Sequence, residues 1–402
     1  MNDKLSLPAG YRAAGIACGL KVSKKLDLSM IVSDEPATAA GVYTQNLVCA
    51  APVLYDRSVT PGKDVRLVVI NSGCANACTG EKGVEDAKRM AEMALAAVPP
   101  RAGYDNGRAL VMSTGVIGHY LPMDKLEAGI KKIATELGTD SDHVLNAATA
   151  ILTTDTHEKI ATRTIQINGF PVKIWGMAKG AGMIGPNMAT MLITVLTDAW
   201  LAPKDAQTML KIVADQTFNC ISVDGHMSTN DTLVFLANGA SGATVQDQQQ
   251  LTEFQQGLFE VCEELARAIP DDGEGAHHLV TLNIKGLKSR SDARKIAKEI
   301  AESALVKCAI NGADPNWGRI VSAAGYADVE FDPYGVNLWV NGFKLFENGF
   351  PLPFDAKVVS ESIRDNREVV VDLTFSEGEE GIRFWTCDLS HEYVHINADY
   401  TT

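Results

Sequence analysis

The chain has 402 residues, of which 46% are hydrophobic and 21% charged, and its formal net charge is −14 at pH 7. This composition predicts a folded protein with more than one sizeable core and excludes a disordered chain. The surplus of carboxylates argues against a nucleic-acid partner, because phosphate backbones bind through clusters of lysine and arginine.

Short strands and turns are predicted for the first sixty residues, where apolar pieces alternate with Gly, Pro and Ser. Two successions of strand, polar loop and helix come next. The first has its strand at 66–71, its loop at 71–80 and its helix at 81–98, and the second has its strand at 108–113, its loop at 114–122 and its helix at 123–137. The loops of such units often carry function.

The rest of the chain mixes hairpins with long helices. A hairpin turns at Asn168-Gly169, and 189–200 reads as a strand buried on both faces. Helices are predicted at 247–269 and 291–305, and the tail returns to strands. No regular βαβ repeat is apparent, so we expect an α+β fold built from mixed α/β layers rather than a doubly wound sheet.

The cysteines and histidines do not predict a disulfide or a metal site. The eight cysteines are scattered, which suits buried side chains in a reducing compartment. Cys74 and Cys78 lack a second pair to complete four zinc ligands. Glu274, His277 and His278 offer ligand types, but adjacent histidines point apart on a strand. With no apolar signal segment or membrane-spanning run either, we expect a cytoplasmic protein with no membrane partner.

Residues 180–185, GAGMIG, match the spacing G-x-G-x-x-G of dinucleotide-binding turns. That fingerprint must open a helix whose N-terminus faces the pyrophosphate. Here Pro186 and Asn187 lead into a β-branched strand sequence, and Asp198 comes too early to be the usual ribose acid. Nicotinamide binding is therefore not predicted.

Thr190 stands at the start of that strand, after the small-residue run KGAGMIGPNMA. A hydroxyl there could attack the carbonyl of Ala189, and hydrolysis of the resulting ester would free a new amino terminus. A free α-amine has a pKa of about 7.7–8.0, so it can take the proton of the threonine hydroxyl without a Ser-His-Asp triad. Local sequence alone favours the alternative, an ordinary β-branched residue in a strand.

The stretch KGAGMIGPNMATMLITVLTD resembles the self-cleavage segment of the ornithine acetyltransferase family. These enzymes are glutamate N-acetyltransferases of arginine biosynthesis, and the resemblance is to the bifunctional ArgJ type. Further matches span the chain, namely LPAGYRAAGIACGLK, NSGCANACTG, STGVIG, TTDTHEK, DGEGAHH, NGADPNWGRI and HINADYTT. The resemblance implies cleavage between Ala189 and Thr190 into an alpha chain of 1–189 and a beta chain of 190–402. It also implies a layered α+β fold and a heterotetramer of two alpha and two beta chains.

The same resemblance assigns roles to residues of this sequence. Thr190 is expected to be the catalytic nucleophile, with Thr114 and Gly115 as the oxyanion hole, a role that suits a loop at a strand end. The expected substrate-binding residues are Thr153, Lys179, Thr190, Glu274, Asn397 and Thr402. Thr154 and Thr156 are close enough to Thr153 to leave that match open by a residue.

Two of these residues carry charges that suit the substrates. Lys179 could pair with the α-carboxylate that ornithine and glutamate derivatives share, although a solvated lysine is the usual fate of such a position. Glu274, between two glycines, could attract the cationic end of ornithine. The segment from Asp314 to Arg319 is distinctive of the family without an assigned role, and Cys49 departs from the lysine that relatives often have there.

The implied reaction is a ping-pong transfer of acetyl from N2-acetylornithine to glutamate through an acyl-Thr190 intermediate. No cofactor is expected, and the sequence leaves open whether acetyl-CoA also serves as donor. One alternative is an N-terminal-nucleophile hydrolase, an aminopeptidase or amidase in which water resolves the acyl-threonine. A binding protein that keeps only the fold is a more distant alternative.

Overall fold

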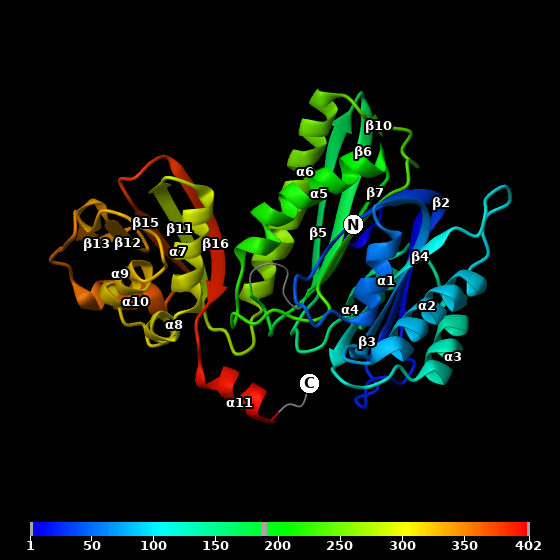
Figure 1. Ribbon diagram of the computed structural model, residues 1–402, viewed down its shortest axis with the longest axis horizontal. Coiled ribbons are helices and arrows are strands. Elements are labelled where there is room, and N and C mark those ends of the chain that lie inside the picture. Colours follow the sequence, from blue (N-terminus) through cyan, green and yellow to red (C-terminus); the bar gives the residue numbers. More distant parts are fainter. Residues whose placement is uncertain (1–2, 186–190, 400–402) are drawn as a thin grey trace.

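The computed structural model describes residues 3–185 and 191–399. Its strands form two main sheets, which belong to two lobes seen side by side in Figure 1. The first lobe holds an eight-stranded sheet in the order β4-β3-β2-β9-β7-β6-β5, with β1 paired to β2. Its strands are β1 (Tyr11–Ile16), β2 (Leu28–Tyr43), β3 (Gly62–Cys74), β4 (Arg108–Val116), β5 (Lys159–Ile167), β6 (Phe170–Lys179), β7 (Leu192–Thr197) and β9 (Thr232–Ala237).

The long strand β2 folds this sheet over on itself. Its pairing with β3 shifts register between Val32 and Ala37 and again before Ala39, and such bulges bend a strand and increase its twist. Side chains of the two halves then meet in the same core cluster, with Leu110 of β4 and Trp175 of β6 both buried there. The lobe is therefore a double layer of strands with a core between the layers.

Helices cover the outer faces of the two halves. The helices α2 and α3 pack on the half that contains β3 and β4, and α5 and α6 pack on the half that contains β5 to β7 (Figure 1). The helices of this lobe are α1 (Ala51–Val59), α2 (Gly80–Ala97), α3 (Met123–Ile133), α4 (Ser141–Ala150), α5 (Pro203–Gln216) and α6 (Gln248–Asp271). Short 3-10 turns η1 (Asp3–Leu5) and η2 (Phe218–Cys220) and the strand pair β8 (Trp200–Leu201) and β10 (Thr244–Val245) complete it.

The second lobe is a six-stranded sheet with helices packed against it, in the strand order β14-β13-β12-β15-β11-β16. Its strands are β11 (Leu279–Leu287), β12 (Asn337–Val340), β13 (Phe343–Glu347), β14 (Phe350–Pro351), β15 (Glu368–Thr374) and β16 (Glu380–Cys387). Its helical segments are α7 (Arg290–Glu302), α8 (Ala304–Asn311), α9 (Trp317–Gly325), η3 (Pro333–Gly335) and α10 (Ala356–Arg364). A continuous core cluster joins it to the first lobe through α6.

The family-specific segment from Asp314 to Arg319 has a structural place in this lobe. Asn316 begins α9 by accepting a hydrogen bond from the backbone N–H of Arg319 at 3.3 Å. The ring of Trp317 stacks on Phe346 with 5.1 Å between centroids. These contacts fix the start of α9 against the sheet, which gives the motif a packing role.

The layered α+β expectation is confirmed, with three local differences. Residues 51–59 form a helix, α1, where strands and turns were expected, because Pro52 lies in its first turn and suits a helix start. The strand β4 continues through Thr114 and Gly115, which pair with Ser72 and Gly73 of β3. The tail ends in a helix, α11 (His391–Asp399), and not in a strand. No helix among the described residues is long and apolar enough to cross a membrane.

Candidate active site

Six of the expected site residues line the same pocket. They come from β4, the loop before β5, the end of β6, the loop after α6 and the C-terminal helix, and are Thr114, Gly115, Thr153, Lys179, Glu274 and Asn397. Thr154 also lines this pocket, whereas Thr156 does not. Ala189, Thr190 and Thr402 lie outside the described residues. The pocket thus gathers residues from both sides of the expected cleavage point.

Gly115 is a position that only glycine fits. Its φ is +128°, and a Cβ added to it would lie 2.4 Å from the backbone carbonyl carbon of Gly73. This close approach of β4 to β3 places the backbone of Thr114 and Gly115 at the pocket wall. Asn230 holds the wall together, because its side-chain amide donates to the carbonyls of Ala75 at 2.7 Å and Ser113 at 2.8 Å.

Lys179, the last residue of β6, is buried and not a solvated strand-end lysine. Its Nζ donates to the Thr153 hydroxyl at 2.7 Å and lies 3.9 Å from the nearer carboxylate oxygen of Asp155. Burial lowers the pKa of Lys179, an effect that the negative charge of Asp155 opposes. The two expected substrate-binding residues Thr153 and Lys179 therefore touch each other.

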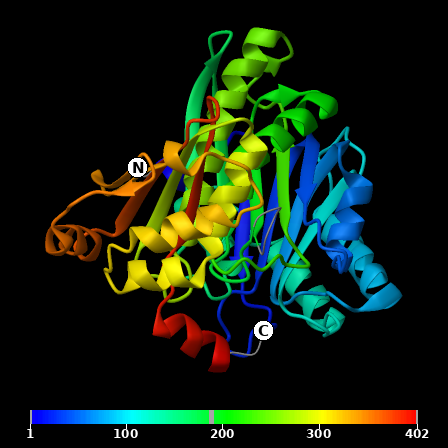
Figure 2. The same cartoon turned by 60° about the vertical axis from the view of Figure 1, so that its left-hand side comes forward.

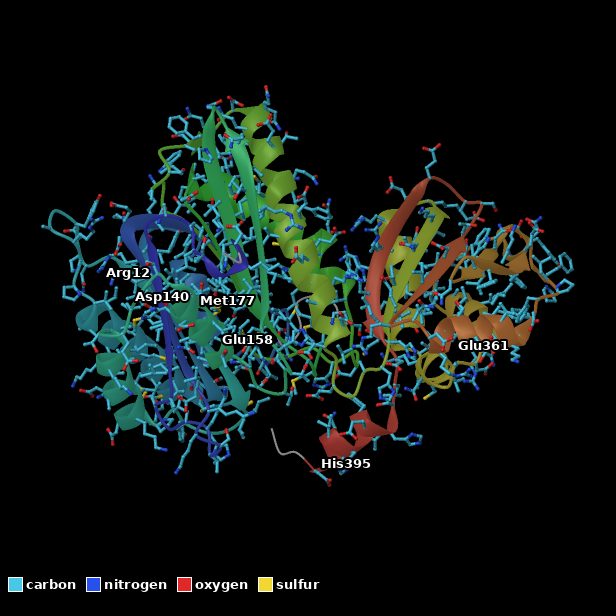
Figure 3. The ribbon with its side chains drawn as sticks, turned by 180° about the vertical axis from the view of Figure 1, so that it is seen from behind. Arg12, Asp140, Glu158, Met177, Glu361 and His395 are labelled. Atoms are coloured by element: carbon cyan, nitrogen blue, oxygen red, sulfur yellow. The ribbon has the colours of Figure 1, made fainter. Side chains whose placement is uncertain are left out.

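Glu274 and Asn397 also touch each other. The Asn397 side chain donates to the Glu274 carboxylate at 2.8 Å, and the Glu274 backbone N–H donates to Ala181 at 2.9 Å. Gly182 is packed so closely that an added Cβ would lie 2.4 Å from the Glu274 carboxylate carbon. The helix α11, which carries His395 in Figure 3, lies below the second lobe. Helix α11 therefore brings Asn397 to the pocket.

The segments on each side of the expected cleavage point are anchored by two carboxylates, the half-buried Asp224 and the buried Asp231. Asp224 accepts hydrogen bonds from the backbone N–H groups of Met183 at 2.7 Å and Ile184 at 2.9 Å. Asp231 accepts from the backbone N–H of Met191 at 3.0 Å. Burial raises the pKa of Asp231 well above its usual range.

The histidines near Glu274 take different positions. His277 is exposed, whereas His278 is buried and its Nδ1 lies 2.9 Å from the carboxylate of Asp388. Their rings therefore do not converge with Glu274 on a common ligand. No group of three or more metal-ligating side chains occurs within residues 3–185 and 191–399.

Comparison with known proteins identifies the family. The family model described as "ArgJ family" matches residues 12–402. The chain belongs to the ArgJ family. The "Arginine biosynthesis bifunctional protein ArgJ" of Rhodopirellula baltica is 47% identical over 399 residues, which cover 98% of this chain and 96% of that protein. The protein of the same name from Thermotoga neapolitana is 42% identical over 407 residues, covering 98% and 100%.

A solved structure of an ArgJ protein from Bacillus halodurans is also similar. It is 32% identical, with a TM-score of 0.49, and the match covers 52% of this chain and 97% of that one. The expected family is thus confirmed by the ArgJ family model and by relatives that align over nearly their whole length.

Sequence reasoning missed the charged residues behind the pocket of this ArgJ-family chain. Asp155 accepts hydrogen bonds from the Lys159 ammonium at 2.8 Å and from the backbone N–H of Gly180 at 2.6 Å. Lys159 also bonds Asp272 at 2.6 Å. An Asp and a Lys four residues apart in TTDTHEK were the available signal, but that spacing is usually a weak surface pair. Only the burial of this pair makes its charges important for the energy of the site.

Proposed function

We propose that this chain transfers acetyl from N2-acetylornithine to glutamate, after cleaving itself before Thr190. The single observation that carries the proposal is the pocket in which Thr114, Gly115, Thr153, Lys179, Glu274 and Asn397 meet. The family resemblance named these residues one by one from distant parts of the chain, and Gly182 and Met183, which lead toward 186–190, line the same pocket. A protein that kept only the fold would not need this set of polar side chains.

The charges of the pocket suit amino-acid substrates. Lys179 offers an ammonium to an α-carboxylate, and Thr153 fixes its direction through their 2.7 Å hydrogen bond. Glu274 offers a carboxylate to the side-chain amine that N2-acetylornithine retains. The cationic and anionic groups come from separate elements, so they can hold the two ends of one substrate.

The reaction has two acyl-transfer steps. The Thr190 hydroxyl oxygen attacks the acetyl carbonyl carbon, the α-amine of Thr190 takes the hydroxyl proton, and that proton passes to the nitrogen of ornithine as the C–N bond breaks. Backbone N–H of Gly115 and the Thr114 hydroxyl stabilise the oxyanion. Glutamate then attacks the acetyl ester through its neutral amine, the C–O bond breaks, and the proton returns to Thr190.

The cleaved chain works as an assembly of two alpha chains, 1–189, and two beta chains, 190–402, in the cytoplasm. The strands β7 and β9 of the beta chain lie in the same sheet as β1 to β6 of the alpha chain, so the two would stay joined after cleavage. Acetyl-CoA is a candidate second donor, because the relatives carry the name "bifunctional". No other cofactor enters the scheme.

The test incubates the purified protein with N2-acetylornithine, with and without glutamate. Formation of N-acetylglutamate supports the proposal, acetate alone indicates a hydrolase, and no turnover indicates a binding protein. A third arm replaces N2-acetylornithine with acetyl-CoA, and N-acetylglutamate there would establish the second donor. The Thr190→Ala variant serves as the control in every arm and should give no product.

A further inference from the structure

Four charged side chains are buried together, with Lys179 in the pocket wall and Asp155, Lys159 and Asp272 behind it. The side chains of Asp155 and Lys159 are 0% exposed, that of Asp272 is 3% exposed and that of Lys179 is 2% exposed. Two are cations and two are anions, so the cluster is neutral as a whole. A buried charge destabilises the fold unless it is paired, so it matters which lysine pairs with which carboxylate.

The two lysines share the two carboxylates unequally. The Lys159 ammonium lies 2.8 Å from Asp155 and 2.6 Å from Asp272, so it is closely paired on both sides. The Lys179 ammonium lies 3.9 Å from Asp155, and its hydrogen bond within the described residues goes to the neutral hydroxyl of Thr153. An ammonium has three N–H donors, so Lys179 keeps donors for a ligand in the pocket that it lines.

Asp155 links three parts of the site. Its carboxylate accepts hydrogen bonds from the backbone N–H groups of Thr153 at 3.1 Å and of Gly180 at 2.6 Å, and it faces Lys179. Burial alone would raise the pKa of Asp155, but the charges of Lys179 and Lys159 and the hydrogen bonds from Lys159 and Gly180 hold it well below the usual range. These contacts favour the ionised form of Asp155 beside Lys179.

We infer that Asp155 and Lys159 are positioning residues that hold Lys179 as an ionised donor without a close counter-ion, ready for the carboxylate of a substrate. Asp155 keeps the buried ammonium charged. Lys159 and the backbone of Gly180 hold the Oδ1 oxygen of Asp155, and this keeps the Oδ2 oxygen at 3.9 Å from Lys179 instead of in a closed pair. The inference rests on the proposed function, in which Lys179 binds the substrate α-carboxylate.

Other charged groups also face Lys179, and the variants leave these residues in place. Glu274 follows α6, Asp231 precedes β9, and both carboxylates favour the charged ammonium. Lys21, in the loop after β1, interacts with Lys179 as a like charge. The variants below change only Asp155 and Lys159, so differences among them report on this pair.

The test follows the alkaline limb of kcat/KM for N-acetylglutamate as acetyl donor to ornithine at saturating ornithine. N-acetylglutamate has no amine, and its carboxylates are fully ionised above neutral pH, so the donor itself does not titrate there. Deprotonation of Lys179 then contributes to the loss of activity with rising pH, and Lys21, whose pKa burial lowers to about 8, is present in every variant. Asp155→Asn removes the nearby anion and should move the limb to lower pH by about one unit or more.

Lys159→Met should move the limb the opposite way, to higher pH, and should raise KM because Asp155 is free to pair with Lys179. The double variant Asp155→Asn/Lys159→Met should return the limb toward that of the parent protein. Lys159→Arg is the matched control, since it keeps the charge and should keep the limb. If Lys159→Met does not fold, the Asp155→Asn and double variants still show in which direction each substitution moves the alkaline limb.

Two failures are distinguishable. A parent protein that transfers no acetyl between N-acetylglutamate and ornithine overturns the proposed function. A parent protein that is active, with variants whose limbs do not move or all move in the same direction, overturns the positioning role and leaves the function intact. A denaturing gel of each variant confirms that only cleaved protein is compared.

Discussion

Replacing Lys179 with methionine should weaken the binding of both N2-acetylornithine and glutamate while leaving the fold intact. Methionine keeps most of the buried volume and removes the ammonium. Asp155 does not become an orphaned charge, because Lys159 stays at 2.8 Å and the backbone of Thr153 and Gly180 still donates to it. We therefore expect the thermal unfolding midpoint to change little.

The loss should instead appear in substrate binding. Removing one partner of a buried, hydrogen-bonded charge pair costs about 2–5 kcal/mol. At about 1.4 kcal/mol per tenfold, KM should rise by about 30-fold to a few thousand-fold for both N2-acetylornithine and glutamate. The α-carboxylate is common to both substrates, so the two increases should be similar.

Steady-state kinetics with each substrate varied in turn measures these changes. Lys63→Met, at an exposed lysine, is the control for removing a positive charge and should leave both KM values unchanged. A folded, cleaved Lys179→Met protein whose KM values stay near those of the parent would refute the assignment of Lys179 to the carboxylate.

Three further outcomes are expected. The Thr190→Ala variant should stay uncut and inactive, whereas Thr190→Ser should be cleaved yet transfer acetyl more slowly, because loss of the γ-methyl frees χ1. A denaturing gel with N-terminal sequencing checks the cleavage, and an alanine variant that cuts itself would contradict the expectation. Glu274→Gln should raise KM for N2-acetylornithine more than for glutamate, and equal increases would show that the charge is wrongly assigned. Gly115→Ala should lower kcat strongly, because an added Cβ would lie 2.4 Å from the backbone of Gly73 and force the two strands apart; the unfolding midpoint and kcat together distinguish a displaced oxyanion donor from an unfolded protein, and an unchanged kcat would argue against the oxyanion role.

Figure 2 shows why so many distant residues meet in one place. The C-terminal helix α11 lies at the same end of the molecule in this view as in Figure 1, beneath the second lobe and near the loops at the strand ends. Tyr393 of α11 donates to Asp224 at 3.3 Å, and the same carboxylate holds the backbone of Met183 and Ile184. The tail is therefore tied to the segment that leads toward the expected cleavage point.

The sequence by itself determined the local elements and the family. Periodicity predicted a long helix at 247–269, and the structure has α6 at Gln248–Asp271. Asn168-Gly169 marked the hairpin between β5 and β6. These features depend on residues near one another in the chain, whose spacing and turn chemistry are visible without a fold. The quoted motifs identified the family for the same reason.

Only the tertiary structure decided how β2 bends and which charges are buried. The register shifts in β2 depend on pairing with β3, and no local pattern fixes such pairing. Lys159 and Asp155 look like an ordinary i,i+4 surface pair in sequence, and burial beside Asp272 and Lys179 makes them a constraint on the site. The energy of a charge depends on what surrounds it, and that is set by contacts between residues far apart in the chain.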